Sequence, residues 1–149
     1  MKILASLFLI IAFAACNQSA KDPEAKQVTS IQATADTSTS GVYFANLKNG
    51  DKVHSPVMIE MGVRGMVVEP AGKVEEGKGH HHLIIDGSFV EQGQPVPEDA
   101  THIHFGKGQT AYAAELYPGK HTLTLQFANG LHQSYGQDWS HTISITVEK

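Results

Sequence analysis

Residues 79–86 read GHHHLIID and carry the clearest strand signal in the chain. Their apolar second half ends at an Asp-Gly turn dipeptide, a combination typical of a β-strand. Side chains alternate between the two faces of a strand. If Leu83 and Ile85 face a hydrophobic core, His80 and His82 therefore lie as a pair on the opposite face.

Similar strand signals continue from Gly41 to Lys149. Short runs of β-branched and aromatic residues are separated by Gly, Pro and Asn, and no window shows a helical period. About seven such runs predict an all-β domain over residues 41–149, an immunoglobulin-like β-sandwich of about seven strands. The Cys-Trp-Cys pattern of true immunoglobulin domains is missing from the sequence, so the prediction concerns architecture alone. The expected strands lie near residues 42–44, 57–63, 80–86, 102–105, 110–116, 121–127 and 142–147.

A second pair of histidines occurs in HIHF, residues 102–105. Ile103 and Phe105 suit the core, which would place the two histidines together on the other face of that strand. Two histidine pairs on neighbouring strands would bring four imidazoles within reach of one ion. We therefore predict a metal site formed by His80, His82, His102 and His104.

Three further histidines are reserve ligands in this prediction. His81 lies within the first histidine stretch, His121 begins a later expected strand, and His132 lies in a long loop that would close over the site. Asp86 is expected to accept a hydrogen bond that orients a ligand histidine, because ligating imidazoles usually donate their second N–H to such a group.

The ligand types favour copper or zinc. Neutral imidazole suits divalent copper and zinc. The single cysteine, Cys16, lies before the domain, so the domain offers no thiolate. We expect a role in binding, delivery or buffering of the ion, and the sequence leaves enzymatic activity uncertain.

Two other interpretations remain open at the level of sequence. In one, the domain is a non-catalytic interaction or structural module that recognises an envelope polymer or a partner protein. The histidines would then be internal polar scaffolding, with His81 or His121 donating to a backbone carbonyl or to Asp86. In the other, the domain is a metal hydrolase that uses Glu98 or Asp99 as its base.

The N-terminal region predicts export and lipidation. Residues 1–15 have a positive start, an apolar run and small residues at the end, as a secretory signal does. The residues before Cys16 resemble the bacterial lipobox, which implies lipid on the Cys16 sulfur and cleavage before it. Residues 16–40 are rich in Ser, Thr and Ala and lack aromatic residues, as expected for a flexible linker. We therefore expect a lipoprotein anchored to the cell envelope, on the periplasmic side of the outer membrane.

The charge of the chain argues against nucleic-acid binding. The formal net charge is −4 with neutral histidines, and the sequence has no basic run. A general nucleic-acid binder would carry a basic face, so we expect no nucleic-acid partner.

Several motifs together resemble a known bacterial family, the domain-of-unknown-function 4399 family. They are GHHHLIID at residues 79–86, HIHFGKGQT at 102–110 and PGKHTLTL at 118–125, with Gly65-Met66 and Glu69-Pro70-Ala71-Gly72 also fitting. Members of that family are typically small exported proteins, so the resemblance implies export and the domain boundaries. It implies no activity.

Overall fold

A computed structural model describes residues 40–149 of the chain. The predicted signal peptide, Cys16 and all but the last residue of the predicted linker lie outside the described residues.

The described residues form two β-sheets. The smaller sheet is antiparallel, with the order β1-β3-β7. The larger sheet has the order β2-β9-β8-β5, and two short strands, β4 and β6, pair with the remaining edge of β5. The strands are β1 (Gly41–Phe44), β2 (Lys52–His54), β3 (Val57–Arg64), β4 (Val67–Val68), β5 (Lys78–Ile85), β6 (His102–His104), β7 (Ala111–Ala114), β8 (Gly119–Ala128) and β9 (Ser140–Glu148).

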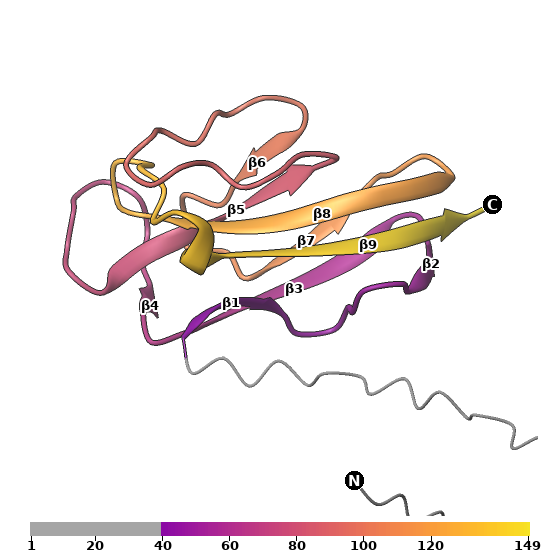
Figure 1. Cartoon of the computed structure of the whole chain (residues 1–149), viewed down its shortest axis with the longest axis horizontal. Helices are drawn as coiled ribbons and strands as arrows, with labels where there is room; N and C mark the ends of the chain where they lie inside the picture. The colour runs from indigo at the N-terminus through magenta and orange to yellow at the C-terminus, as the bar shows by residue number, and fades with distance from the viewer. Residues whose placement is uncertain (1–39) are drawn as a thin grey trace, which may run out of the picture. The chain divides into compact units, whose positions relative to one another are not determined.

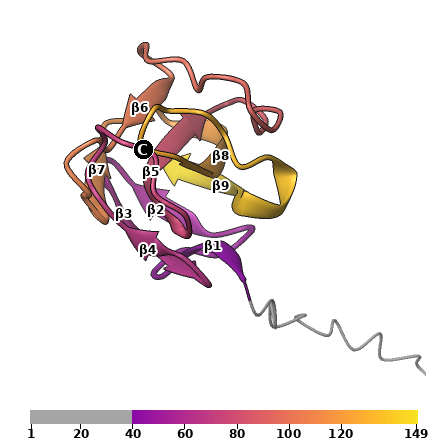
Figure 2. The same ribbon diagram turned by 90° about the vertical axis from the view of Figure 1, so that its left-hand side faces the viewer.

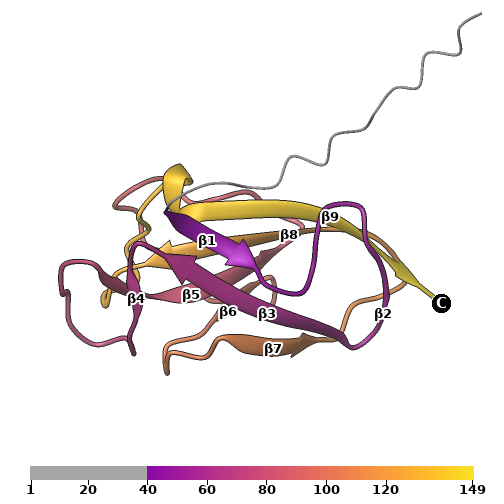
Figure 3. The ribbon, with the colours of Figure 1, turned by 90° about the horizontal axis from the view of Figure 1, so that it is seen from below.

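This arrangement confirms the all-β prediction and is β-sandwich-like. Figure 1 shows β8 and β9 lying above β1 and β3, and the end-on view of Figure 2 separates β3 and β7 from β8 and β9. Seen from below in Figure 3, β1 and β3 lie in front of strands of the larger sheet, and β7 lies beside β3. Within residues 40–149, the one helical element is the 3-10 turn η1 (Gln137–Trp139). No helix of this part of the chain is long and apolar enough to cross a membrane.

The expected number of strands was too low. The described residues contain nine strands, and the two that the sequence pattern missed are β2 and β4, of three and two residues. Each pairs in parallel at an edge of the larger sheet. Strands this short show no alternation of apolar and polar residues, so periodicity cannot detect them.

The apolar core lies between the two sheets. Alternate residues of the larger sheet, such as Leu83, Leu125 and Phe127, are fully buried there. They pack in one cluster with residues of the smaller sheet, such as Ile59 and Met61. The expectation that Leu83 faces the core is therefore confirmed.

The opposite face of β5 and β8 is also covered, by the segments 87–101 and 129–136. Gln126, fully buried on this face, accepts from the Val90 amide (3.1 Å) and donates to the Gly136 carbonyl (3.1 Å). Ser134 donates to the Val90 carbonyl (2.7 Å), which ties the two covering segments together. A second interior therefore lies on the outer side of the larger sheet, with buried apolar residues such as Ile84 and Val96 and with polar residues that include His80 and His82.

Candidate metal site

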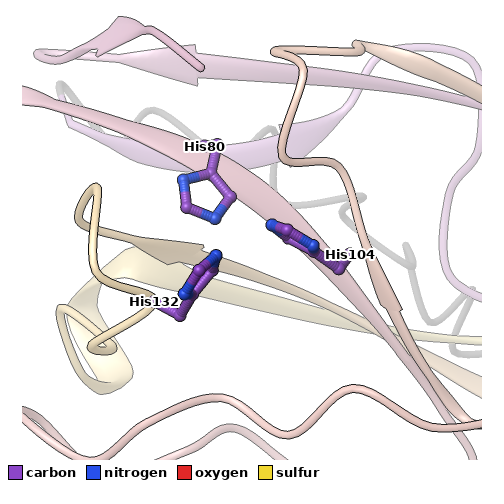
Figure 4. A group of neighbouring side chains, drawn as sticks. All are labelled: His80, His104 and His132. Atoms are coloured by element: carbon purple, nitrogen blue, oxygen red, sulfur yellow. The ribbon is translucent and has the colours of Figure 1, made fainter. Parts of the chain in front are cut away.

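Three histidines from distant parts of the sequence converge in this second interior. His80 comes from β5, His104 from β6, and His132 from the loop after β8. Each offers one ligand atom, and the three atoms lie within 4.8 Å of one another. Figure 4 shows the three rings turned toward one shared space.

His82 adjoins this group as a fourth imidazole. Its Nε2 atom lies 3.1 Å from Nε2 of His80, and its ring stacks on that of His104 with centroids 5.0 Å apart. The strand register explains the stacking, because His82 and His104 are direct partners across β5 and β6. We call His80, His82, His104 and His132 the histidine cluster.

The separation of the two Nε2 atoms fits ligation of a single ion. Imidazole nitrogens bind zinc at about 2.0–2.1 Å, so two ligands on one ion lie about 2.9 Å apart at a right angle and about 3.3 Å apart at the tetrahedral angle. The observed 3.1 Å between His80 and His82 falls between these values, and it is also the distance of an N–H···N hydrogen bond between the two rings.

Each ring of the histidine cluster has a buried nitrogen without a hydrogen-bond partner among the described residues. These atoms are Nδ1 of His80 and His82 and Nε2 of His104 and His132. A buried polar group left without a partner costs about 1–3 kcal/mol. Buried polar atoms are nearly always paired, so the unpaired Nε2 atoms of His104 and His132 are candidates to hold a ligand. In His80 and His82 the unpaired atom is Nδ1, whereas the Nε2 atoms of these two rings contact each other.

The surroundings favour the neutral form of three of the rings, His80, His82 and His104. Burial, followed by the neighbouring imidazoles, lowers the pKa of His80 to about 4 and that of His82 to about 2. Burial and His132 likewise lower the pKa of His104. Neutral imidazole is the form that binds a metal ion, so these three rings are in the form needed for ligation at neutral pH.

His104 is fixed from two sides. Its Nδ1 atom lies 3.6 Å from a carboxylate oxygen of Glu98, which leaves Nε2 for the shared space. On another side, the ring packs so tightly on Gly106 that a Cβ there would lie 2.3 Å from the Cε1 atom of His104. A carboxylate beside a ligand imidazole is a common way to orient that ring.

His132 is held by a tight turn. Its φ is 64°, a left-handed conformation that non-glycine residues rarely adopt. The side-chain oxygen of Asn129 accepts from the amides of Leu131 (2.9 Å) and Gln133 (3.1 Å), and the Asn129 carbonyl accepts from the His132 amide (2.9 Å). Strained residues persist where the surroundings fix them, and they occur often at functional sites.

The structure does not bring His102 into the cluster, although the sequence predicted it there. His102 faces Ile84 across the strand pair, at the start of β6, and its Nδ1 lies 2.9 Å from the Asp99 carboxylate. The turn before the strand fixes the Asp99 carboxylate beside this ring, because Asp99 also accepts from the Thr101 and His102 amides. His132, predicted as a reserve ligand, lies where His102 was expected, beside the rings of His80 and His104.

The remaining reserve residues lie elsewhere. His81 is fully buried on the core face of β5, against Phe127. His121 donates from Nδ1 to Asp86 and from Nε2 to the Tyr117 carbonyl, both at 2.9 Å. Asp86 therefore orients His121 and no member of the histidine cluster.

Of the two acidic residues considered as hydrolytic bases, Asp99 is engaged in hydrogen bonds, whereas the exposed Glu98 only approaches the His104 ring. Methionine sulfur does not add to the cluster either: Met61 is part of the apolar core, Met66 packs against it, and Met58 is exposed. The donor set at the site is therefore imidazole nitrogen.

The fold and the site together define a β-sandwich-like domain with a cluster of four imidazoles, two of them buried and two half-buried. The chain belongs to the DUF4399 family: the family model described as "Domain of unknown function (DUF4399)" matches residues 59–148. This match confirms the resemblance predicted from the sequence, and its range contains the whole histidine cluster. No curated protein and no solved structure gives a significant match to the chain.

Proposed function

We propose that this domain binds one divalent transition-metal ion, copper or zinc, through His80, His104 and His132, with His82 as a fourth ligand. The observation that carries the proposal is the convergence of three ligand atoms within 4.8 Å, on rings with unpaired buried nitrogens. An all-imidazole donor set without thiolate suits divalent copper and zinc.

The proposed role is binding, delivery or buffering of the ion. A shell filled by four protein ligands is typical of structural or storage sites, whereas catalytic sites keep a position for water. Asp99, one of the two acidic residues of the neighbouring turn, is hydrogen-bonded to His102.

We also propose that the protein is an exported lipoprotein, held at the periplasmic side of the outer membrane by lipid on Cys16. The leader, the single cysteine and the polar linker support this location. The two sheets, with a shared core between them, support an immunoglobulin-like type for the tethered domain. The test of the anchor is labelling of bacterial cells with a radioactive fatty acid. Label is expected on the wild-type protein and none on Cys16→Ser, and equal labelling of both would refute the anchor.

A non-catalytic module is the second candidate. His121 and His102 favour it, because both rings are tied to neighbouring acceptors as internal scaffolding. This explanation does not account for the unpaired nitrogens of the histidine cluster. A partner protein or an envelope polymer would be the ligand of such a module.

The metal proposal is tested by calorimetric titration of the purified, chelator-treated protein with zinc and copper salts. We expect one high-affinity ion per chain. The matched control is His54→Ala, because His54 lies on the exposed strand β2, away from the cluster. Loss of binding in the triple variant of His80, His104 and His132 with retention in the control supports the site, and an unchanged titration of the triple variant refutes it.

A further inference from the structure

The segment that follows β4, residues 69–72, connects the three ligand-bearing parts of the chain. It has three backbone N–H groups, because Pro70 has none, and all three donate. Glu69 donates to the Gly79 carbonyl (2.7 Å), Ala71 to the Gly106 carbonyl (2.9 Å), and Gly72 to the Gly130 carbonyl (2.9 Å).

Each of the three accepting carbonyls lies close in sequence to one ligand of the proposed site. Gly79 directly precedes His80. Gly106 follows His104 by two residues, and Gly130 precedes His132 by two residues. One short segment is therefore hydrogen-bonded to the backbone beside each of His80, His104 and His132.

The three acceptors share a second property, since none has room for a side chain. A Cβ would lie 2.2 Å from the Ala128 carbonyl oxygen at Gly79 and 2.3 Å from the His104 ring at Gly106. At Gly130 it would lie 1.7 Å from the carbonyl oxygen of Lys73, the residue that follows the segment. Glycine at 130 allows the His132 loop to approach the residue after the segment, whereas glycine at 79 allows β5 to approach β8 and glycine at 106 leaves room for the His104 ring.

We propose that residues 69–72 are a positioning segment that fixes the distances among His80, His104 and His132 before an ion binds. This inference rests on the proposed metal-binding function. A site whose ligands are already placed binds more tightly, because less ordering is needed on binding. Residues that hold metal ligands in place typically change affinity by about 10–100-fold when mutated.

Gly130→Ala tests the positioning segment, because the added methyl group forces the His132 loop away from Lys73. The matched control is Gly77→Ala in the same β4–β5 loop, which has a positive φ of 70° and nothing within 4 Å of the added Cβ. Two quantities are measured: the affinity for zinc, and the imidazole NMR resonances of the metal-free protein. Ala71→Pro, which removes the N–H donated to Gly106, provides the same readouts if Gly130→Ala does not fold.

We expect Gly130→Ala to lower zinc affinity about 10–100-fold and to shift the His132 ring resonances of the metal-free protein, with Gly77→Ala leaving both unchanged. Wild-type affinity in both Gly130→Ala and Ala71→Pro would overturn the positioning role and leave the metal site standing. If the wild-type protein binds no zinc, the metal proposal fails. The NMR spectra then decide on the segment: shifted cluster resonances in the variants support positioning, and unchanged resonances refute it.

Discussion

The ring of His104 occupies the space that a side chain at residue 106 would need. A Cβ on Gly106 would lie 2.3 Å from Cε1 and 2.4 Å from Nε2 of His104. The glycine thus allows the turn after β6 to close against a ligand of the proposed site. Local backbone packing and the proposed metal site meet at this contact.

Gly106→Ala is expected to displace the His104 ring and to lower zinc affinity by about 10–100-fold, measured by competition with a chromogenic chelator. The control is Gly108→Ala in the same turn. Its added Cβ would meet atoms no closer than 3.7 Å, although its φ of 77° disfavours alanine. The control should therefore lose about 1 kcal/mol of stability and keep its affinity. Equal zinc affinities of Gly106→Ala and the wild type would show that the position of the His104 ring does not contribute to zinc binding.

His132→Ala and His102→Ala separate the structural assignment from the sequence-based one. Removing His132 takes away a converging ligand, so zinc affinity should fall by at least about 100-fold, beyond the effect typical of residues that only support ligands. His102 is engaged with Asp99, so His102→Ala should bind as the wild type does. Calorimetry on both variants provides the check. Loss of zinc binding in His102→Ala with retention in His132→Ala would support the ligand set predicted from strand alternation instead.

His81→Leu is expected to stabilise the metal-free protein or leave it unchanged at pH 7.5. Both ring nitrogens of His81 are buried without a partner among the described residues, at a cost of about 1–3 kcal/mol. Leucine of similar size removes that cost. Urea denaturation measures the change, with the exposed His54→Leu as control. A loss of more than about 2 kcal/mol would mean that His81 makes a contact that the structure does not show.

The same substitution should change the pH dependence of stability. Burial lowers the pKa of His81 to about 4, against about 6.5 in the unfolded chain. Between these values the unfolded state binds the proton and the folded state does not, so stability is lost as the pH falls from about 6.5 to about 4. His81→Leu should reduce this slope by up to about 1.4 kcal/mol per pH unit. Identical slopes in both proteins would contradict the assignment of a neutral, buried ring.

Asp86→Asn tests the ion pair with His121. Burial alone would lower the pKa of His121, but the hydrogen bonds to Asp86 and the Tyr117 carbonyl outweigh it and raise the pKa. Hydrogen bonds from Thr122 and His121 outweigh burial at Asp86 and lower its pKa. The pair therefore stabilises the fold fully between about pH 4 and pH 6.5, and its contribution is lost as the pH rises through the raised His121 pKa.

The expected loss in Asp86→Asn is about 1 kcal/mol or less at pH 5.5, because the Asp86 side chain is half exposed, and it should shrink above pH 8. Asparagine tolerates the positive φ of residue 86, so backbone strain does not confound the comparison. Thermal denaturation at the two pH values measures the difference. A loss that grows with pH would contradict a charged His121.

Strand alternation was enough to predict most of the fold and three of the four cluster residues. In residues 79–86 it placed Leu83 in the core and His80 and His82 together on the other face, and it selected His104 in the next strand. These predictions depend on local geometry, which a sequence pattern encodes directly.

The rest of the site depends on contacts that alternation does not encode. His102 lies on the predicted face, but the Asp99 turn at the strand's start holds its ring. His132 reaches the cluster only because the Asn129 turn folds its loop over the sheet. The Asn-Gly dipeptide at residues 129–130 was the available signal for that turn. The second interior was also missed, because coverage of a sheet face by loops is a long-range property.

The most direct test of the histidine cluster is X-ray absorption spectroscopy at the zinc edge on the zinc-loaded protein. The proposed site predicts a first shell of three or four nitrogen atoms at about 2.0–2.1 Å, with the multiple scattering typical of imidazole and no sulfur. A shell made mainly of oxygen, or one with fewer than two imidazoles, would contradict the proposed site.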